Sequence, residues 1–540
     1  MIHFFIETIP RKEENEHSAY PTKQIEINRA KIDKEERNRN RIFPLKMIVV
    51  NDSQKFHGGC LKQFQCVMSN LGAPEQICRL LNGSYIPFKL KPPLILPNPI
   101  VIQSYRTKTS LNMIRQIQSM LKSGVLEQAE PSASFLSTFF LVPKPDGSYR
   151  PILNLKQLNR FVKTKPFRLF SHFRVPTFLQ HQDWMAKLDL SQAYFHVPIA
   201  RRHRRYLRLN YPINSNQHQL LQMTCLPFGL SSAPRTFASI TNWVAEFLRN
   251  RGIRCVVYLD DFLLASQSMQ QLQEDISLTI KIMQLLGWTI NFEKSVLTPT
   301  QCLEFLGITW DTKLNAMSLS EKKCLTLRNA LQQQLLKRKW SLKQYQILMR
   351  RLNFATYVTR RGRLHCRTLQ YFSRQLSKDH PYRQVSIPLP VQSEMEWWLQ
   401  AVGQSVPIHT NVVLTHLLTT DASDIGWGAQ LGDISIGGTW TKRQLTWHAN
   451  RKEMFAVQAA ISHEQKLLQN SQVLLQTDNR TVVSYINKEG GSKSKKLLEQ
   501  TLQLLALLDK FNIHLQAQYF PDSMSKWTPY HAKGLAPSDT

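Results

Sequence analysis

The sequence predicts an α+β protein made of several domains. Its 540 residues exceed the size at which a single hydrophobic core stops growing. Short apolar runs with the composition of β-strands alternate with longer segments of helical periodicity. Acidic residues interrupt the strand-like runs in two distant parts of the chain. These three observations indicate mixed secondary structure and two separate sites.

The chain is strongly basic. It contains 69 Lys and Arg against 38 Asp and Glu, which gives a formal net charge of +31. The excess lies along the body of the chain and not in a tail, as expected for a protein that binds an extended polyanion such as nucleic acid. A basic surface also serves solubility, but this charge is large for solubility alone.

The eight cysteines show neither a CxxC pair nor a zinc-ligand spacing, which favours reduced thiols in a cytoplasmic or nuclear protein. No apolar run approaches the roughly 20 residues of a membrane span. The apolar start, Met1 to Pro10, lacks the basic flank and cleavage site of a secretory signal. We therefore expect a soluble protein that is not secreted and has no membrane partner.

Two adjacent carboxylates, Asp260 and Asp261, lie inside the apolar run from Cys255 to Ala265. The flanking residues have strand composition, which predicts a hairpin with the acidic pair at its tip. Burying an ionised carboxylate is costly unless a cation compensates it, and a divalent metal is the simplest compensation. A tight turn that happens to carry two acids would give the same pattern, so this stretch alone leaves both interpretations open.

A third acid, Asp189, takes the place of a hydrophobic residue in the strand-like segment from Ala186 to Ile199. Three carboxylates on adjacent strands can hold two Mg²⁺ ions roughly 4 Å apart, which clamp the attacking and leaving oxygens of a phosphoryl transfer. The sequence thus predicts metal-dependent phosphoryl-transfer chemistry at Asp189, Asp260 and Asp261.

The motifs Tyr258–Asp261, Leu226–Phe237 and Phe305–Ile308, together with the Asp189 segment, resemble the reverse transcriptases of retroviruses and LTR-type retrotransposons. They occur in that family's order and spacing. The resemblance implies a right-hand polymerase, with fingers, a ferredoxin-like palm and a helical thumb and connection. It also implies an RNA-directed DNA polymerase that acts on an RNA template, a DNA primer and dNTPs.

The same resemblance assigns a nucleotide site. Lys144 and Arg150, on opposite arms of a predicted hairpin that turns at Asp146-Gly147, match the residues that contact the triphosphate. Tyr194 matches the aromatic residue that lies under the sugar and excludes a ribose 2′-hydroxyl. Phe228 and Gly229 match a junction where the missing Cβ lets the backbone approach a ligand. Lys294 lies near the lysine that assists the leaving pyrophosphate, although a lysine after a helix is common.

A second acidic set lies near the end of the chain. Asp421 occurs in the strand-like segment from Leu417 to Gly428, Glu453 in a helix, and Asp478 at the end of a strand. Asn450 as an N-cap three residues before Glu453 would give the glutamate a purely structural role. The set resembles the ribonuclease H active site, in which carboxylates hold two Mg²⁺ ions to hydrolyse RNA in an RNA:DNA hybrid. Asp522 is the candidate fourth acid, although the loop before it is shorter than in that family.

Periodicity predicts the other elements. Five arginines between the Asp189 segment and the Leu226 motif are expected to contact nucleic-acid backbone or to be solvated. The predicted helices and strands are Leu111–Val125, Ser137–Pro145, Ala233–Leu248, Phe305–Trp310, Leu319–Leu336, Ile434–Trp440 and Val473–Thr477, and the arginines are Arg201, Arg202, Arg204, Arg205 and Arg208.

The resemblance divides the chain into six segments. The run from Asp478 to Gly491 looks particularly like the DIRS group, which is related to gypsy elements. The segments are a charged leader (1–57), an N-terminal extension (58–104), fingers and palm (105–315), a basic helical thumb and connection (316–410), a ribonuclease H-like domain (411–527) and a tail (528–540).

The leading hypothesis is therefore a reverse transcriptase with a ribonuclease H that serves retrotransposon replication. Mg²⁺ is the expected cofactor, two ions per site, with Mn²⁺ as the alternative. An integrase or recombinase is expected on another polypeptide, because no such motif is present. The alternative is a catalytically defective or domesticated nucleic-acid-binding remnant of a retroelement. A cellular DNA polymerase is disfavoured by the second acidic set.

Overall fold

The computed structural model describes residues 56–96, 111–143, 147–212, 218–410 and 413–521. Two compact units divide the chain, one ending at residue 299 and interrupted by residues 171–185, the other comprising that interruption and everything from residue 300. Lys144, Asp522, most of the predicted leader and the tail lie outside the described residues. Nowhere in the described part is a helix both long and apolar enough to cross a membrane.

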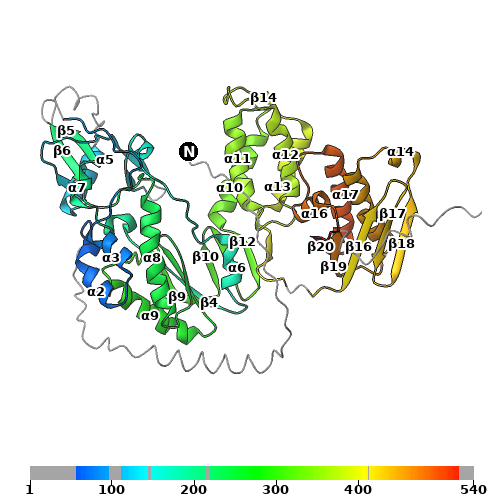
Figure 1. The fold of residues 1–540 in the computed structure, drawn as a ribbon, viewed down its shortest axis with the longest axis horizontal. Helices are drawn as coiled ribbons and strands as arrows, with labels where there is room; N and C mark the ends of the chain where they lie inside the picture. Colours follow the sequence, from blue (N-terminus) through cyan, green and yellow to red (C-terminus); the bar gives the residue numbers. More distant parts are fainter. Residues whose placement is uncertain (1–55, 97–110, 144–146, 213–217, 411–412, 522–540) are drawn as a thin grey trace, which may run out of the picture. The chain divides into compact units, whose positions relative to one another are not determined.

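The first unit holds one sheet of four strands, in the order β7-β8-β4-β9, one of three and one of two (Figure 1). Its strands are β1 (Leu126–Gln128), β2 (Phe139–Pro143), β3 (Tyr149–Leu153), β4 (Trp184–Asp189), β5 (Arg208–Pro212), β6 (His218–Met223), β7 (Cys255–Tyr258), β8 (Asp261–Ser266) and β9 (Val296–Thr300). Its helices include α2 (Gln65–Asn70), α3 (Glu75–Asn82), α5 (Leu111–Lys122), α7 (Arg201–Arg204), α8 (Ala233–Arg249) and α9 (Met269–Leu285), and its 3₁₀ turns η2 (Cys60–Phe64), η3 (Leu158–Arg160) and η5 (Ala193–His196).

The four-stranded sheet carries the first acidic set. Strands β7 and β8 pair antiparallel with Tyr258 opposite Asp261, so Leu259 and Asp260 form the tip of the hairpin. Leu259 has a φ of 56°, the left-handed conformation that a two-residue hairpin turn requires. Helix α8 contacts β7 and α9 contacts β8, which buries the apolar residues of both strands. The predicted hairpin with the acidic pair at its tip is confirmed.

Several other predicted elements of this unit are confirmed. Helix α5 begins at the predicted residue and ends two residues before Gly124, whose φ of 67° terminates it. Helix α8 matches the predicted helix within one residue. Strands β2 and β3 pair antiparallel up to Pro143 opposite Tyr149, as the predicted hairpin requires.

The second unit begins with a four-stranded sheet, β10-β11-β12-β15, and a group of helices in which α13 contacts α10 and α12 (Figure 1). The strands are β10 (Cys302–Phe305), β11 (Ile308–Asp311), β12 (Ala316–Leu319), β13 (Lys339–Trp340), β14 (Val385–Ser386) and β15 (Ser405–Pro407). The helices are α6 (Val175–Phe178), α10 (Glu321–Leu335), α11 (Leu342–Ala355), α12 (Arg367–Phe372) and α13 (Leu389–Ala401), with 3₁₀ turns η4 (His172–Arg174), η6 (Leu364–Cys366) and η7 (Ser373–Gln375).

The predicted strand from Phe305 to Trp310 is wrong. The chain turns back at Leu306 and Gly307, and Phe305 pairs with Ile308 across a two-residue hairpin. Both turn residues have positive φ values, 54° and 74°, which a glycine adopts readily. A continuous apolar run masked this turn. Strands β12 and β15 also lie in a segment that was expected to be helical.

Trp310 anchors this sheet. Its side chain is fully buried and its indole Nε1 donates a hydrogen bond of 3.1 Å to the backbone oxygen of Phe305. Replacing Trp310 with alanine should lower the free energy of unfolding of this unit by about 3–5 kcal/mol, because it leaves a cavity. Denaturant titration followed by circular dichroism measures the loss. Trp310→Phe should cost clearly less, and equal losses would contradict this assignment.

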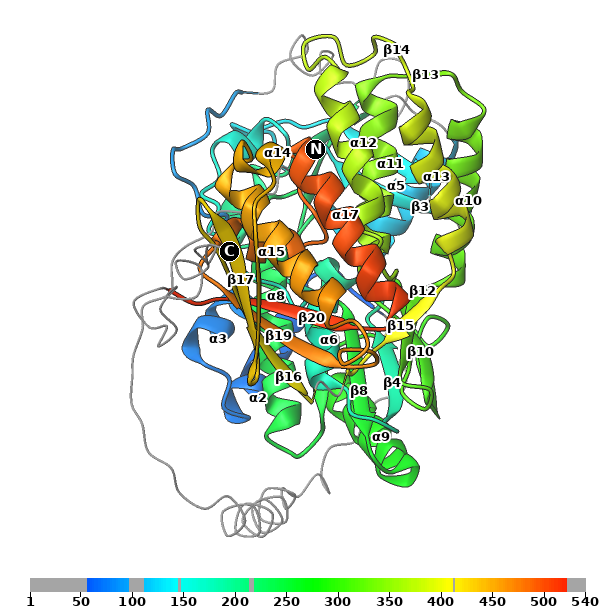
Figure 2. The ribbon, with the colours of Figure 1, turned by 90° about the vertical axis from the view of Figure 1, so that its right-hand side faces the viewer.

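The rest of the second unit is a five-stranded sheet in the order β18-β17-β16-β19-β20. Strands β16, β17 and β18 pair antiparallel, whereas β16, β19 and β20 run parallel. Helices α15 and α17 contact each other over the sheet (Figure 2), around a core that includes Leu418, Met454 and Leu475. The elements are β16 (His416–Ala422), β17 (Gly426–Leu431), β18 (Ile434–Thr439), α14 (Lys442–Leu445), α15 (Ala449–His463), β19 (Gln472–Thr477), α16 (Arg480–Asn487), α17 (Lys495–Lys510) and β20 (His514–Tyr519).

Two sequence-based expectations change here. The single strand-like segment from Leu417 to Gly428 is two antiparallel strands, because Ser423 closes a turn by accepting a hydrogen bond from the Gly426 N–H at 3.2 Å. The N-cap of α15 is His448 and not Asn450. The glutamate that looked like a capping partner is therefore free of that role, and its side chain is 6% exposed.

Candidate active sites

Asp189, Asp260 and Asp261 converge at one end of the four-stranded sheet. The backbone oxygen of Asp260 accepts a hydrogen bond of 3.1 Å from Leu190, which ties the hairpin tip to the end of β4. Asp189 is the last residue of β4 and Asp261 the first of β8, its neighbour in the sheet. All three side chains are half-buried.

The electrostatics of this group show that its carboxylates interact. Burial, followed by the charges of Asp260 and Asp189, raises the pKa of Asp261 to about 7. Burial is also the main cause of the raised pKa of Asp260, and the charge of Asp189 adds to it. Repulsion between like charges in a partly desolvated site has this effect, and a bound cation removes it.

Hydrogen bonds to the backbone hold Asp189 in place. Its N–H donates to the Ser295 hydroxyl at 3.0 Å, and its carbonyl oxygen accepts from the Asn291 N–H at 2.8 Å. The Ser295 hydroxyl in turn donates to the Asn291 oxygen at 2.7 Å. These contacts fix the end of β4 against the turn before β9, which orients the carboxylate.

The predicted nucleotide residues surround the same acids. The Tyr194 ring lies 5.0 Å from Phe228 and 5.0 Å from Phe237 between ring centres. Burial and the charge of Asp260 raise the pKa of Tyr194. The Arg150 guanidinium lies 5.6 Å from the centre of the Phe228 ring. The site therefore brings Arg150, Tyr194 and Phe228 together beside Asp260.

Gly229 and Lys294 also lie at this site. A Cβ at Gly229 would lie 2.9 Å from the Leu153 carbonyl oxygen, and its φ of 101° favours glycine. The exposed Lys294 is close enough for its charge to counteract the rise in the pKa of Asp260. Lys144 is outside the described residues, so its predicted contact with a triphosphate stays a prediction.

The five arginines differ in what they can do. Arg204 forms a salt bridge of 2.8 Å with Glu127, and Arg208 is 5% exposed with hydrogen bonds to Ser132, Ser134 and Gln222. Both stabilise the fold, and Arg208 is too buried to contact nucleic acid, whereas the Arg204 side chain is 18% exposed. Arg202 stacks on the exposed Tyr85 ring at 4.6 Å.

The second acidic set forms a compact cluster. One carboxylate oxygen from each of Asp421, Glu453 and Asp478 lies within 4.8 Å of the others. Among the described residues, Asp189, Asp260 and Asp261 do not form so tight a set. Strands β16 and β19 run parallel with Thr419 opposite Gln476, so the two aspartates, each two residues further, reach the same end of the sheet.

These three acids fit a divalent cation. Oxygens bound to one Mg²⁺ lie about 3–4 Å apart, which is compatible with the observed spacing. Asn479 donates a hydrogen bond of 2.9 Å to Asn450, which links the residue after Asp478 to the first turn of α15. The cluster is thus held by β16, β19 and α15 together.

A basic pocket lies beside α15, between its first turn and the start of α17. Its cationic residues were missed by the sequence analysis, although Arg451 occurs two residues before Glu453. Arg451 stacks on Trp447 with 3.7 Å between the guanidinium carbon and the ring centre. The lining residues include Arg443, His448, Arg451, Lys496 and Glu499. A pocket of this charge suits a phosphate group.

Lys187 was also missed. It lies two residues before Asp189 on β4, and alternate residues of a strand point to the same face. Its charge counteracts the rise in the pKa of Asp261. The period of two along a strand was the signal that could have identified it, because Lys187 and Asp189 share a face.

Comparison with known proteins matches both parts of the chain to family models. Residues 142–310 match the reverse transcriptase (RNA-dependent DNA polymerase) family, and residues 414–511 match the RNase H-like domain found in reverse transcriptases. The chain carries a reverse transcriptase domain followed by a ribonuclease H-like domain. Domains of these families generally use divalent metals.

The relatives agree with this assignment. The Tf2-3 and Tf2-4 transposon polyproteins of Schizosaccharomyces pombe are each 23% identical over 434 residues, which is 76% of this chain and 30% of the polyprotein. The chain thus spans less than a third of these relatives. Together with the family models, they support the reverse transcriptase and ribonuclease H of an LTR-type retrotransposon.

Two solved structures share the fold. The foamy viral protease-reverse transcriptase with double-stranded DNA aligns over 87% of this chain and 99% of its own, with a TM-score of 0.50 and 15% identity. The dRH form with double-stranded DNA aligns over 88% and 84%, with a TM-score of 0.50 and 16% identity. The expected architecture, a polymerase followed by a ribonuclease H-like domain, is confirmed.

Proposed function

We propose that this chain is an RNA-directed DNA polymerase with a ribonuclease H, which copies the transcript of an LTR-type retrotransposon. The observation that best supports this proposal is that two acidic groups, each drawn from distant parts of the sequence, assemble at strand ends inside the two matched domains. Its substrates are an RNA template, a DNA primer and dNTPs for synthesis, and an RNA:DNA hybrid for cleavage.

In the polymerase, Asp189, Asp260 and Asp261 are the proposed ligands of two Mg²⁺ ions, with Mn²⁺ as the alternative. Bound divalent cations would stabilise the charge that develops on the attacking and leaving oxygens. Burial and, after it, the charges of Asp260 and Asp189 raise the pKa of Asp261, and a bound cation would favour the ionised form of these carboxylates. Arg150 and Lys144 are proposed to contact the triphosphate, and Gly229 to admit the nucleotide close to the backbone.

Tyr194 is the proposed gate against ribonucleotides. Its ring is held between Phe228 and Phe237, so it cannot move aside without disturbing that packing. Replacing Tyr194 with valine should raise the relative kcat/KM for rNTPs over dNTPs by about 10–100-fold, because the steric block is removed. Single-nucleotide incorporation kinetics measure the ratio. Tyr194→Phe keeps the ring and should leave the ratio unchanged.

In the nuclease, Asp421, Glu453 and Asp478 are the proposed metal ligands, with Asp522 as a fourth acid. The basic pocket beside α15 is the proposed contact for the hybrid backbone, since cations position nucleic acid through its phosphates. Glu453 takes part through a side chain that the helix buries against the sheet.

Finer assignments rest on the sequence. We propose membership of the DIRS group from the run Asp478–Gly491. We also propose that residues 105–315 form fingers and palm, 316–410 the thumb and connection, and 411–527 the nuclease.

Primer extension tests the proposal. Purified protein with a DNA-primed RNA template, dNTPs and Mg²⁺ should extend the primer, and a labelled hybrid should be cut in a parallel reaction. The alternative, a defective or domesticated remnant, predicts salt-sensitive hybrid binding without metal-dependent turnover in either assay. Binding with no extension at any Mg²⁺ or Mn²⁺ concentration would favour that remnant.

A further inference from the structure

Within the second unit, arginines from the segment between α11 and the end of η7 contact one face of the nuclease. Arg361 donates from Nε and Nη2 to the Asp509 carboxylate, both at 2.9 Å, and Arg360 donates to it at 2.8 Å. Arg361 also lies 3.5 Å from the Glu489 carboxylate. Asp509 is on α17 and Glu489 lies in the loop after α16, so one arginine contacts a nuclease helix and the loop that precedes it.

Two further arginines contact the backbone of the loop between α16 and α17. Arg367 donates to the carbonyl oxygens of Lys488 and, at 3.1 Å, Glu489. Arg374 donates to the carbonyl oxygen of Ser492 and stacks on Tyr371 with 4.4 Å between the guanidinium carbon and the ring centre. These carbonyl groups follow the end of α16, where backbone acceptors lack helical partners.

The residues that make these contacts are held in place both on the arginine segment and on the nuclease. Arg361 and Glu489 both have left-handed backbone, with φ values of 59° and 53°, a conformation that residues with a Cβ adopt at some cost. The Arg361 side chain is only 20% exposed and that of Glu489 22%. Burial alone would raise the pKa of Asp509, but its hydrogen bonds and proximity to Arg361 and Arg360 lower it.

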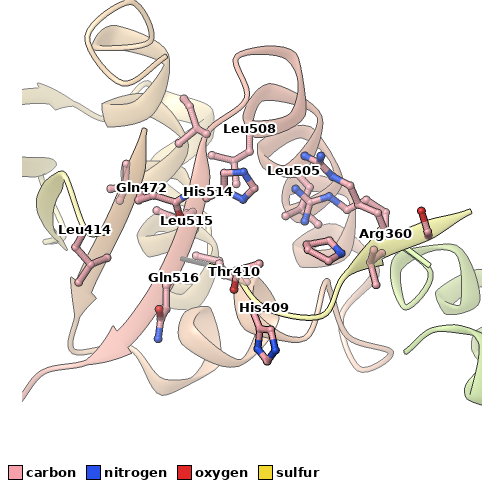
Figure 3. A pocket seen from close by; sticks show the side chains of 17 residues that line it. Arg360, His409, Thr410, Leu414, Gln472, Leu505, Leu508, His514, Leu515 and Gln516 are labelled. Atoms are coloured by element: carbon pink, nitrogen blue, oxygen red, sulfur yellow. The ribbon is translucent and has the colours of Figure 1, made fainter. Parts of the chain in front are cut away.

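Beside these contacts lies a cavity between the arginine-bearing segment and the nuclease. A cavity of about 700 Å³ separates the chain around Arg360 and His409 from the first residues of β19 and β20 (Figure 3). Leu364 and Tyr371, both from the same segment as the arginines, pack against the nuclease core. The orientation of the nuclease on the helices α11 to α13 therefore depends largely on the arginine contacts, which we call the arginine clamp (Arg360, Arg361, Arg367 and Arg374).

The acidic cluster of Asp421, Glu453 and Asp478 is at the other end of the same sheet. The cavity is lined by Gln472 and His514, which begin β19 and β20, whereas Asp478 follows the last residue of β19. The acids lie a full strand length from the cavity end of β19, and a strand rises about 3.3 Å per residue. A small rotation of the nuclease at the clamp would therefore move the acids relative to a bound hybrid.

We propose that the arginine clamp positions the nuclease on the connecting helices and so sets the position at which the RNA of a hybrid is cut. This inference rests on the proposed ribonuclease H activity. The four arginines are positioning residues, because none of them belongs to the acidic cluster. Asp509 and Glu489 are their partners on the nuclease.

The test compares Asp509→Asn and Arg360→Ala with Arg363→Ala in the full chain. Arg363 is exposed, belongs to the same segment and makes none of the clamp contacts, so it is the matched control. On a hybrid with a recessed DNA 3′ end, the two clamp variants should spread the RNA cuts to neighbouring positions at an unchanged total cleavage rate. Raising the salt concentration should also spread the cuts made by the wild type, because it screens partly exposed ion pairs, although total cleavage should then fall as hybrid binding weakens.

A cut pattern identical to the wild type in both clamp variants would overturn the proposal. Hydrogen exchange provides a readout that does not need cleavage. Amides of residues 488–494 should exchange faster in Asp509→Asn than in Arg363→Ala, and equal exchange would also count against the clamp. If the wild type cuts no hybrid, the proposed nuclease activity fails, while hydrogen exchange still decides whether the clamp holds the two parts together. Arg360→Ala, at a side chain that is 54% exposed, should leave folding intact.

Discussion

Replacing Asp260 with asparagine should abolish primer extension on an RNA template. The substitution keeps the size of the side chain but removes one negative charge from the group that we propose as the ligands of the divalent cations. We expect a loss of at least ~10³-fold in kcat, or about 4 kcal/mol of transition-state stabilisation, which is the scale of metal-ion catalysis. Steady-state extension of a labelled DNA primer measures it.

The control for this variant is Glu274→Gln. Glu274 is exposed on α9, in the same unit, so the substitution removes the same charge away from the site. The control should extend primers as the wild type does. The Asp260 variant should still cut a hybrid, because the second acidic set lies in another domain. Extension by Asp260→Asn at the wild-type rate would refute the assignment of the polymerase site.

Replacing Glu453 with glutamine should remove hybrid cleavage and leave DNA synthesis intact. Glu453 is buried and its carboxylate lies within 4.8 Å of both aspartates of the cluster, so an amide there removes one of the three proposed metal ligands. We expect cleavage to fall by about 10²–10³-fold. Cleavage of a labelled RNA strand in a hybrid measures the loss, with primer extension as the internal comparison.

Asp433→Asn is the control for the nuclease. Asp433 is exposed in the turn between β17 and β18, so it tests charge loss within the same domain. Equal cleavage by Glu453→Gln and the wild type would contradict the assignment. A wild type that extends primers but cuts no hybrid would instead mean that the nuclease is defective, which a misplaced Asp522 would explain.

The sequence predicted the hairpin at Asp260 because its signals are local: a pair of acids lies inside an apolar run of strand composition. That run alone could not exclude a tight turn. The grouping of Asp189 with the pair was inferred from a second strand-like run that also carries an acid, and the family resemblance supported it. Strand pairing between β4 and β8 is a long-range contact that no short segment specifies.

The failures arose where a turn was not recognised. Leu306 and Gly307 reverse the chain between two strands, and Ser423 to Ile425 do the same between β16 and β17. The first turn lies within an apolar run, which hides it. The second contains Ser423 and Asp424, which are common turn residues but were assigned to one strand-like segment. Glu453 was ambiguous for another reason: three residues after an asparagine, it fits a cap, and only the actual N-cap, His448, removes that interpretation.

The clamp and the basic pocket had no sequence signal at all. Arginines on a helix surface are usually solvated, and nothing in the residues around Arg361 indicates that Asp509 is its partner. The distinction between Arg208, which is buried, and Arg201, which is exposed, likewise depends on tertiary contacts. Charge alone predicted a polyanionic partner but not which side chains would contact it.

The most direct test of the account is to locate the metals. Diffraction from crystals soaked in Mn²⁺, recorded at the manganese absorption edge, should give anomalous peaks at two places, one between Asp189 and Asp261 and one among Asp421, Glu453 and Asp478. Peaks at both places would establish that each acidic set binds divalent cations. Fully ordered carboxylates with no anomalous peak at either set would contradict the account.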